Sequence, residues 1–248
     1  MSGPILILGG TSDARALADD AAQAGLDIVL SLAGRTSAPA RARARTRVGG
    51  FGGVAGLRAY LRDNRVARVL DATHPFAARM SANAAAACAA ENVPRLALSR
   101  APWSESAGDR WMRVADVAEA AGLLPRLGQR IFVAFADGLG PLAGTGLDFV
   151  VRRIEPADIG LPGAELVLAR GPFAADAEIE LFRARRIDAV LAKDSGGADS
   201  RAKLDAARAL GLPVVLLRRP DPPPGPATFD RAEARSWLGL DAATAASV

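Results

Sequence analysis

An apolar run near the start of the chain passes through two glycines into a helical pattern. Residues 5–8 read Ile-Leu-Ile-Leu, Gly9 and Gly10 follow, and small apolar residues recur at helical spacing over 17–22. A strand that leads directly into a helix with a small apolar face is typical of a parallel sheet covered by helices. The pattern therefore predicts a βαβ series, in which right-handed crossovers are the rule.

The glycine turn after this first strand is a candidate anion site. It places Gly9, Gly10, Thr11 and Ser12 at the start of the predicted helix. Unsatisfied amides and the positive end of the helix favour a pyrophosphate there, so these four residues are predicted cofactor contacts. The alternative is a tight turn that needs glycine conformations and uses Ser12 or Asp13 as helix cap, without any ligand.

Strand and helix patterns alternate along the chain in two series. The first predicts strands at 5–8, 27–32, 68–71 and 95–99, with helices at 13–24, 54–64 and 77–91. The second predicts strands at 130–135, 148–152, 165–169, 189–192 and 214–217, with helices at 114–124, 176–186 and 198–210. A segment over 101–111 with two tryptophans resembles a linker, and a proline-rich connector at 221–226 precedes a short helix at 231–238.

These series predict an α/β protein with two doubly wound, parallel-sheet, Rossmann-like domains and a ligand cleft between them. The expected boundaries are 1–103 for a cofactor-binding domain and 104–248 for a second domain that contributes substrate binding. The C-terminal helix is counted with the second domain, and the prediction includes the option that this helix packs against the first domain. The 248 residues, half of them hydrophobic, provide enough apolar surface for two cores.

Composition excludes several classes of protein. The net charge of +4 comes from interspersed charges, and aromatic residues make up only 5%, so nucleic acid is not an expected partner. No apolar run reaches the roughly 18–20 residues of a membrane span, and no signal-type start is present, so we expect a cytoplasmic, monomeric protein without membrane contact. The single cysteine, Cys88, excludes an intrachain disulfide, and nothing has metal-ligand spacing with the only histidine, so no metal is expected.

The end of the second predicted strand indicates which dinucleotide binds. Ser31, Gly34, Arg35 and Thr36 lie there. An acidic residue at this place would bind the ribose 2′-OH of NAD, whereas an arginine suits the 2′-phosphate of NADP. Arg35 therefore predicts NADPH as cofactor, with Ser31, Gly34 and Thr36 as neighbouring contacts.

Two glycine-rich or basic segments follow. The run over 41–47 alternates arginine with other residues, which indicates either an arginine-lined strand or a solvated edge strand or loop. The next segment, 49–53, reads Gly-Gly-Phe-Gly-Gly and allows close backbone approach to a ligand. Gly50, Phe51 and Gly52 are therefore predicted cofactor contacts.

The only histidine follows the third predicted strand, within Thr73-His74-Pro75, before what reads as a proline-started helix. Doubly wound folds bind ligands at this edge of the sheet, so these three residues are predicted cofactor contacts. The alternative is a hydrogen-bonded structural histidine.

The second series has polar residues at two of its strand ends. Arg170 follows one predicted strand, and Lys193, Ser195, Gly196 and Gly197 follow the next. Arginine, lysine and backbone amides are donors for carboxylates, so these residues predict a substrate site. A loop that only caps a helix is the alternative.

Six segments together resemble the precorrin-6A reductase family, and the resemblance spans nearly the whole chain: 8–15, 49–53, 71–77, 170–173, 193–197 and 219–220. It implies NADPH-dependent reduction of a macrocycle double bond, giving precorrin-6B in cobalamin biosynthesis. It also implies a polycarboxylate tetrapyrrole as substrate, either metal-free or cobalt-bound.

Hydride transfer to the macrocycle also requires a proton. Lys193, His74, Asp176 and water are the candidate sources, and we expect His74 to position ligands rather than to donate the proton. Two rival readings use the same cleft. One is a nucleotide-sugar-dependent transferase with two Rossmann-like domains, and the other is a periplasmic-type binding protein, which the missing signal sequence disfavours.

Overall fold

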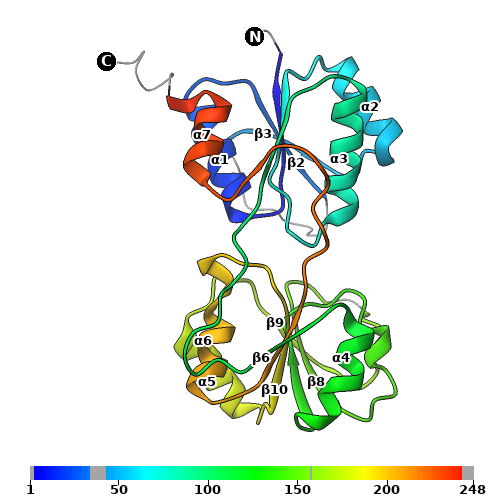
Figure 1. Ribbon diagram of the computed structural model, residues 1–248, viewed down its shortest axis with the longest axis vertical. Helices are drawn as coiled ribbons and strands as arrows, with labels where there is room; N and C mark the ends of the chain where they lie inside the picture. Colours follow the sequence, from blue (N-terminus) through cyan, green and yellow to red (C-terminus); the bar gives the residue numbers. More distant parts are fainter. Residues whose placement is uncertain (1–2, 34–42, 157, 242–248) are drawn as a thin grey trace. The chain divides into compact units, whose positions relative to one another are not determined.

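The computed structural model describes residues 3–33, 43–156 and 158–241 and divides the chain into two compact units (Figure 1). Unit 1 contains the chain up to Arg100 and again from Pro220, and unit 2 contains Ala101–Arg219. The chain therefore passes from one unit to the other twice.

Unit 1 is built on a six-stranded parallel sheet in the order β3-β2-β1-β4-β5-β12. Its strands are β1 (Ile5–Leu8), β2 (Ile28–Leu32), β3 (Arg45–Val48), β4 (Arg68–Asp71), β5 (Arg95–Leu98) and β12 (Ala227–Thr228). Its helices are α1 (Ser12–Gln23), α2 (Gly53–Asp63), α3 (Ala78–Ala90) and α7 (Arg231–Leu238). In Figure 1, α1 and α7 cover one face of the sheet and α2 and α3 cover the other.

The apolar run of β1 explains why both faces are covered. Ile5 and Ile7 pack with residues of α1 and α7, whereas Leu6 and Leu8 pack with residues of α2 and α3. A strand buried on both faces must be apolar at every position, as residues 5–8 are.

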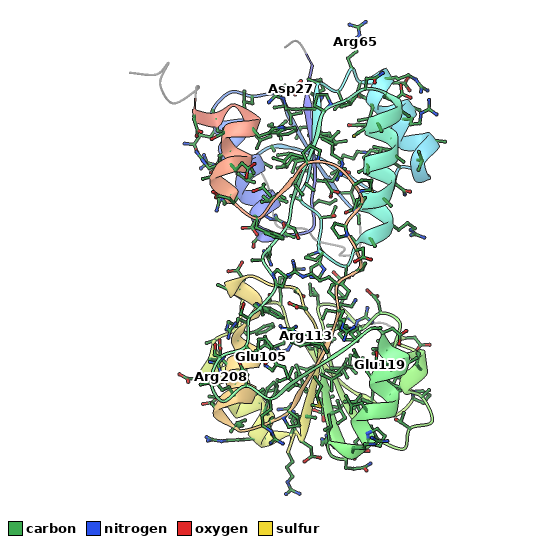
Figure 2. All side chains as sticks on the ribbon, viewed as in Figure 1. Asp27, Arg65, Glu105, Arg113, Glu119 and Arg208 are labelled. Atoms are coloured by element: carbon green, nitrogen blue, oxygen red, sulfur yellow. The ribbon has the colours of Figure 1, made fainter. Side chains whose placement is uncertain are left out.

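Unit 2 repeats this architecture in the order β9-β8-β7-β10-β11-β6. Its strands are β6 (Trp111–Val114), β7 (Arg130–Val133), β8 (Asp148–Arg153), β9 (Glu165–Leu168), β10 (Ala189–Lys193) and β11 (Val214–Leu217). Its α-helices are α4 (Val117–Leu123), α5 (Ala175–Ala184) and α6 (Ala202–Ala209), with short 3₁₀ turns at Leu124–Arg126, Gly140–Leu142 and Ala198–Ser200. Figure 1 shows α5 and α6 on one face and α4 on the other, and Figure 2 shows side chains filling the space between sheet and helices.

The sheet of unit 1 has the doubly wound order 3-2-1-4-5-6, and the sheet of unit 2 has the same arrangement except that its edge strand β6 comes first along the chain, which gives 4-3-2-5-6-1. In doubly wound sheets, ligands bind beyond the carboxyl ends of the strands where the order reverses. The prediction of two parallel-sheet, Rossmann-like domains is confirmed, and the cleft between them stays a prediction. None of the helices in the described residues is both long and apolar enough to cross a membrane.

Some expected boundaries differ from the structure. β6 begins at Trp111, the last residue of the expected linker over 101–111, and the proline-rich connector leads into β12 before α7. The edge strand β3 overlaps the end of the arginine run, which agrees with one of the alternatives for that run. Residues from Pro220 onward belong to unit 1 rather than to a second domain over 104–248. The reason is that β12 pairs with β5 and that Ala234 and Leu238 of α7 join the core around α1.

Candidate functional site

The two glycines of the β1–α1 turn serve different purposes. A Cβ atom on Gly9 would lie 2.8 Å from Leu30 Cδ1 and 2.9 Å from Leu32 Cδ2, so this glycine is needed for packing against β2. Gly10 has a φ of +141°, and a Cβ atom there would meet only the amide nitrogen of His74, at 3.7 Å. Gly10 therefore leaves open space between the α1 terminus and the loop after β4.

Thr11, not Ser12 or Asp13, caps α1. Its Oγ1 accepts a hydrogen bond from the Ala14 amide at 3.1 Å and donates one to the Ala72 carbonyl at 3.0 Å. The cap therefore ties the glycine turn to the end of β4. The Ser12 and Asp13 side chains instead bind Arg100, by a 2.6 Å hydrogen bond and a 2.8 Å ion pair.

The loop after β4 is organised by a buried aspartate. Asp71 Oδ1 accepts hydrogen bonds from Thr73 Oγ1 at 2.9 Å and from the Thr73 amide at 3.4 Å. Asp71 Oδ2 pairs with Arg95 Nη1 at 3.3 Å, and Thr73 Oγ1 also lies 3.0 Å from Ser81 Oγ. Thr73 is thus fixed by Asp71 of β4 and Ser81 of α3, and Asp71 is in turn held by Arg95 of β5.

His74 is held in a defined tautomer. Its Nδ1 accepts a hydrogen bond from the Phe76 amide at 3.2 Å, so the neutral ring carries its proton on Nε2. An imidazolium would need protons on both nitrogens and would lose this bond. The expectation that Pro75 starts the next helix is wrong, because α3 begins at Ala78 and the Ala77 amide donates to the His74 carbonyl at 2.7 Å.

Arg47 connects the end of β2 to the glycine loop. Its Nη1 donates to Ser31 Oγ at 3.1 Å and to the Gly49 carbonyl at 2.6 Å, while Nη2 donates to the Gly50 carbonyl at 2.8 Å. The guanidinium carbon lies 3.8 Å from the centre of the Phe51 ring. A Cβ atom on Gly50 or Gly52 would meet no atom within 4 Å, so the loop exposes open backbone.

Three predicted cofactor residues, Gly34, Arg35 and Thr36, lie outside the described residues. Of the neighbouring arginine run, Arg43 donates from its amide to Asp19 at 2.6 Å, and Arg45 pairs with Asp27 at 3.5 Å. The sequence analysis considered Arg47 only as the last arginine of the run over 41–47 and did not select it as a cofactor contact, although its place two residues before the glycine loop is a usable signal.

The predicted substrate loop of unit 2 follows β10. Lys193 is the last residue of β10, and its Nζ lies 4.7 Å from the centre of the Phe135 ring. The Ser195 amide donates to the Lys193 carbonyl at 2.7 Å, and the Ser195 hydroxyl donates to the same carbonyl at 3.3 Å. Gly196 and Gly197 have φ values of +63° and +76°, conformations that favour glycine.

The remaining predicted residues lie on other elements. Arg170 is exposed just beyond β9, and Asp176 is exposed in the first turn of α5. Two residues further, Glu178 is buried and pairs with Arg152 of β8 at 2.6 Å. Its Oε2 and the Nε of Arg152 are buried without a hydrogen-bond partner, and the sequence analysis did not select either residue.

Lys203 completes this buried charged group. Its Nζ lies 4.9 Å from the centre of the Trp103 ring and donates to the Ser200 carbonyl. Burial lowers the pKa of its ammonium to about 8, and the positive charge of Arg152 acts in the same direction, against the opposing effect of Glu178.

Fold and turn chemistry define a two-domain α/β protein of the Rossmann-like class, with polar loops at the carboxyl ends of β1, β4 and β10. A family model described as precorrin-6x reductase CbiJ/CobK matches residues 4–239. The chain belongs to this family.

Named relatives agree with the family match. The chain is similar to the precorrin-6A reductase of Rhodobacter capsulatus, with 46% identity over 244 residues and 97% of each chain covered. A solved structure titled CobK precorrin-6A reductase matches with a TM-score of 0.89 and 44% identity, covering 96% of each chain. The cobalt-precorrin-6A reductase of Priestia megaterium is 30% identical over 232 residues, covering 87% of this chain and 90% of that protein. These findings do not favour the transferase alternative.

Proposed function

We propose that the chain reduces one double bond of the precorrin-6A macrocycle to give precorrin-6B in cobalamin biosynthesis, with NADPH as hydride donor. The observation that carries the proposal is the family match over 4–239 together with the form of the β1–α1 turn. Gly10 at φ +141° leaves the start of α1 accessible, and a helix start of this kind favours a pyrophosphate.

NADPH supplies the hydride when it is bound, and the residues of unit 1 bind and orient it. The open side of Gly10 and the first turn of α1 suit the pyrophosphate, with Gly9 and Thr11 holding the turn in shape. We assign the 2′-phosphate to Arg35 and Ser31, because an arginine at the end of the second strand suits that group. The further contacts in the proposal are Ser12, Gly34, Thr36, Gly50, Phe51, Gly52, Thr73, His74 and Pro75.

The substrate carries carboxylate side chains, and the donors of unit 2 suit them. Arg170, Lys193 and the amides of Gly196 and Gly197 offer charged and backbone donors. The proposed substrate is metal-free precorrin-6A, because the Rhodobacter relative named for that substrate is 46% identical, against 30% for the cobalt-precorrin relative.

His74 positions ligands in this proposal, because the Phe76 amide at Nδ1 fixes the ring so that it presents its Nε2–H. Lys193, Asp176 and water are the other candidate proton sources. We favour Lys193, because its ammonium carries a proton and stands at the end of β10, whereas Asp176 is exposed on α5.

The test is anaerobic turnover with purified precorrin-6A, followed as the loss of NADPH absorbance. We expect NADPH to be oxidised only when precorrin-6A is present, and NADH to be used far less well. A protein that oxidises neither cofactor with precorrin-6A would contradict the proposed function.

The chain contains two lysines, which gives a matched pair of variants for the proposed site. We expect Lys193→Met to raise the KM for precorrin-6A about 10-fold or more, as the loss of a charged hydrogen bond implies. Lys203→Met removes the other lysine, which contacts the Trp103 ring and the Ser200 carbonyl rather than the proposed carboxylate site, and should raise this KM less than Lys193→Met does. Equal effects of both variants would remove Lys193 from the site while leaving the reaction itself in place.

A further inference from the structure

Asp194, directly after β10, holds the segment by which the chain enters unit 2. It is 5% exposed, and its Oδ2 accepts a hydrogen bond from Arg113 Nη1 of β6 at 3.1 Å. Its Oδ1 accepts one from the Trp103 amide at 3.2 Å, and Arg113 Nη2 donates to the Trp103 carbonyl at 3.1 Å. Arg113, labelled in Figure 2, therefore bridges the aspartate and the backbone of the entering segment.

The segment that leaves unit 2 meets the same aspartate. Arg219, the last residue of unit 2, donates from Nε to the Asp194 carbonyl at 2.6 Å and from Nη2 to the Ala101 carbonyl at 3.3 Å. The indole nitrogen of Trp103 donates to the Gly197 carbonyl at 2.9 Å. Hydrogen bonds around Asp194 thus join three parts of the chain: the loop after β10, the segment with Trp103 by which the chain enters unit 2, and Arg219, where the chain leaves it.

Unit 1 repeats this arrangement with different residues. Asp71 ends β4, which occupies the place in the first sheet that β10 occupies in the second. Arg95 Nη1 pairs with Asp71 Oδ2 at 3.3 Å, and Arg95 Nη2 donates to the Pro224 carbonyl at 3.0 Å. Pro224 lies in the segment that returns to unit 1 and leads into the edge strand β12, as Trp103 lies before the edge strand β6.

Each aspartate also starts a loop that the proposed function assigns to a ligand. Asp71 fixes Thr73, next to His74, and Asp194 precedes Ser195 and the two glycines of the substrate loop. The planar guanidinium can bind a carboxylate and a carbonyl at once in a fixed geometry, which a lysine cannot reproduce. A loop held in this way cannot shift without disturbing the connecting segment.

We propose that Asp71–Arg95 and Asp194–Arg113 are equivalent positioning pairs, each of which fixes one ligand loop to one of the two segments that connect the units. The assignment of NADPH to the first loop and precorrin-6A to the second rests on the proposed function. The positioning itself does not, and it can be measured without ligands.

Hydrogen exchange of the ligand-free protein tests the positioning directly. Asp194→Asn keeps the size of the side chain and removes its charge, so amides over 195–201 should exchange at least about tenfold faster while those over 72–78 keep their rates. Asp71→Asn should show the reverse pattern. Asp188→Asn is the control. Asp188 lies just before the amino end of β10, whereas Asp194 follows its carboxyl end, and Asp188 Oδ2 accepts hydrogen bonds from the Gln129 and Arg130 amides at 2.8 Å.

Steady-state kinetics then test the ligand assignment. Asp71→Asn should raise the KM for NADPH about 10-fold or more, and Asp194→Asn should raise the KM for precorrin-6A by a similar factor, each with a smaller change in kcat. If a variant does not fold, Arg95→Lys or Arg113→Lys keeps the charge while losing the two-pronged contact, and should give the same selective pattern.

The outcomes distinguish a failure of the positioning pairs from a failure of the proposed function. Selective loosening in the exchange experiment supports the positioning pairs even if precorrin-6A is not reduced. Loosening of both loops by either variant, of neither loop, or of the same loop by Asp188→Asn would overturn them.

Discussion

Gly56 in α2 is a glycine whose replacement should disturb the glycine loop over 49–53, the proposed cofactor contact. A Cβ atom at this position would lie 1.6 Å from the carbonyl oxygen of Phe51 and 2.8 Å from its carbonyl carbon. Real Cβ atoms do not approach other atoms closer than 3.0 Å, so Phe51 or α2 must move by more than an ångström. Phe51 is not free to move, because the Arg47 guanidinium stacks on its ring at 3.8 Å and the Tyr60 ring contacts it at 5.1 Å.

The magnitude follows from two opposing terms. Alanine is favoured over glycine inside a helix by about 1 kcal/mol, whereas forced overpacking costs about 1–3 kcal/mol or more. With a backbone atom as the obstacle we expect the upper part of that range to apply, so Gly56→Ala should lower the free energy of unfolding by about 1–2 kcal/mol. Gly122 in α4 is the matched control, because a Cβ atom there meets nothing within 4 Å and Gly122→Ala should be neutral or stabilising by up to about 1 kcal/mol.

The assay is urea unfolding followed by circular dichroism, with NADPH titration of the same samples. Gly56→Ala should be less stable than Gly122→Ala and should bind NADPH more weakly, because the Gly-Phe-Gly backbone is displaced. The reasoning is refuted if Gly56→Ala is as stable as Gly122→Ala and binds NADPH as the unmodified chain does.

Two further predictions use titrating groups. Because burial lowers the pKa of Lys203 to about 8, the unfolded chain binds more protons between about pH 8 and 10.5, so stability should rise with pH there by up to about 3 kcal/mol relative to Lys203→Met. Urea unfolding at several pH values checks this, and a pH-independent difference between the two proteins contradicts it. Burial raises the pKa of Cys88 to about 11, so its thiol should resist a thiol reagent at pH 8 in the folded protein and react once unfolded. Rapid labelling of the folded protein would show that Cys88 is accessible.

The strands predicted most accurately are those whose signal is local. Residues 5–8, 68–71 and 214–217 match β1, β4 and β11 to the residue. Residues 5–8 and 214–217 are wholly apolar runs next to proline or glycine, and residues 68–71 have an apolar centre between two charged residues. β12 has only two residues between turns, and its pairing with β5 depends on the chain returning from unit 2. A pattern read along the sequence does not contain such a contact.

In the candidate site, too, features with a local signal could be predicted from the sequence, whereas contacts between distant residues could not. The glycine turn and the His74 loop could be placed together because strands of a parallel sheet end at one edge. The partners of Asp71 and Asp194 could not, since Arg95 is 24 residues from Asp71 and Arg113 is 81 residues from Asp194. In a chain this rich in arginine, only the fold shows which guanidinium reaches which carboxylate.

Transfer of deuterium from NADPH labelled at the reactive position of its nicotinamide ring tests the central claim most directly. Precorrin-6A, the protein and labelled NADPH are mixed anaerobically, and the product is analysed by mass spectrometry. The account predicts a tetrapyrrole that has gained two hydrogens, one of them deuterium, and about tenfold less of this product when Lys193→Met is assayed for the same time at precorrin-6A concentrations well below its KM. A reduced product without deuterium, or no reduced product with the unmodified chain, would contradict hydride transfer from NADPH to the macrocycle.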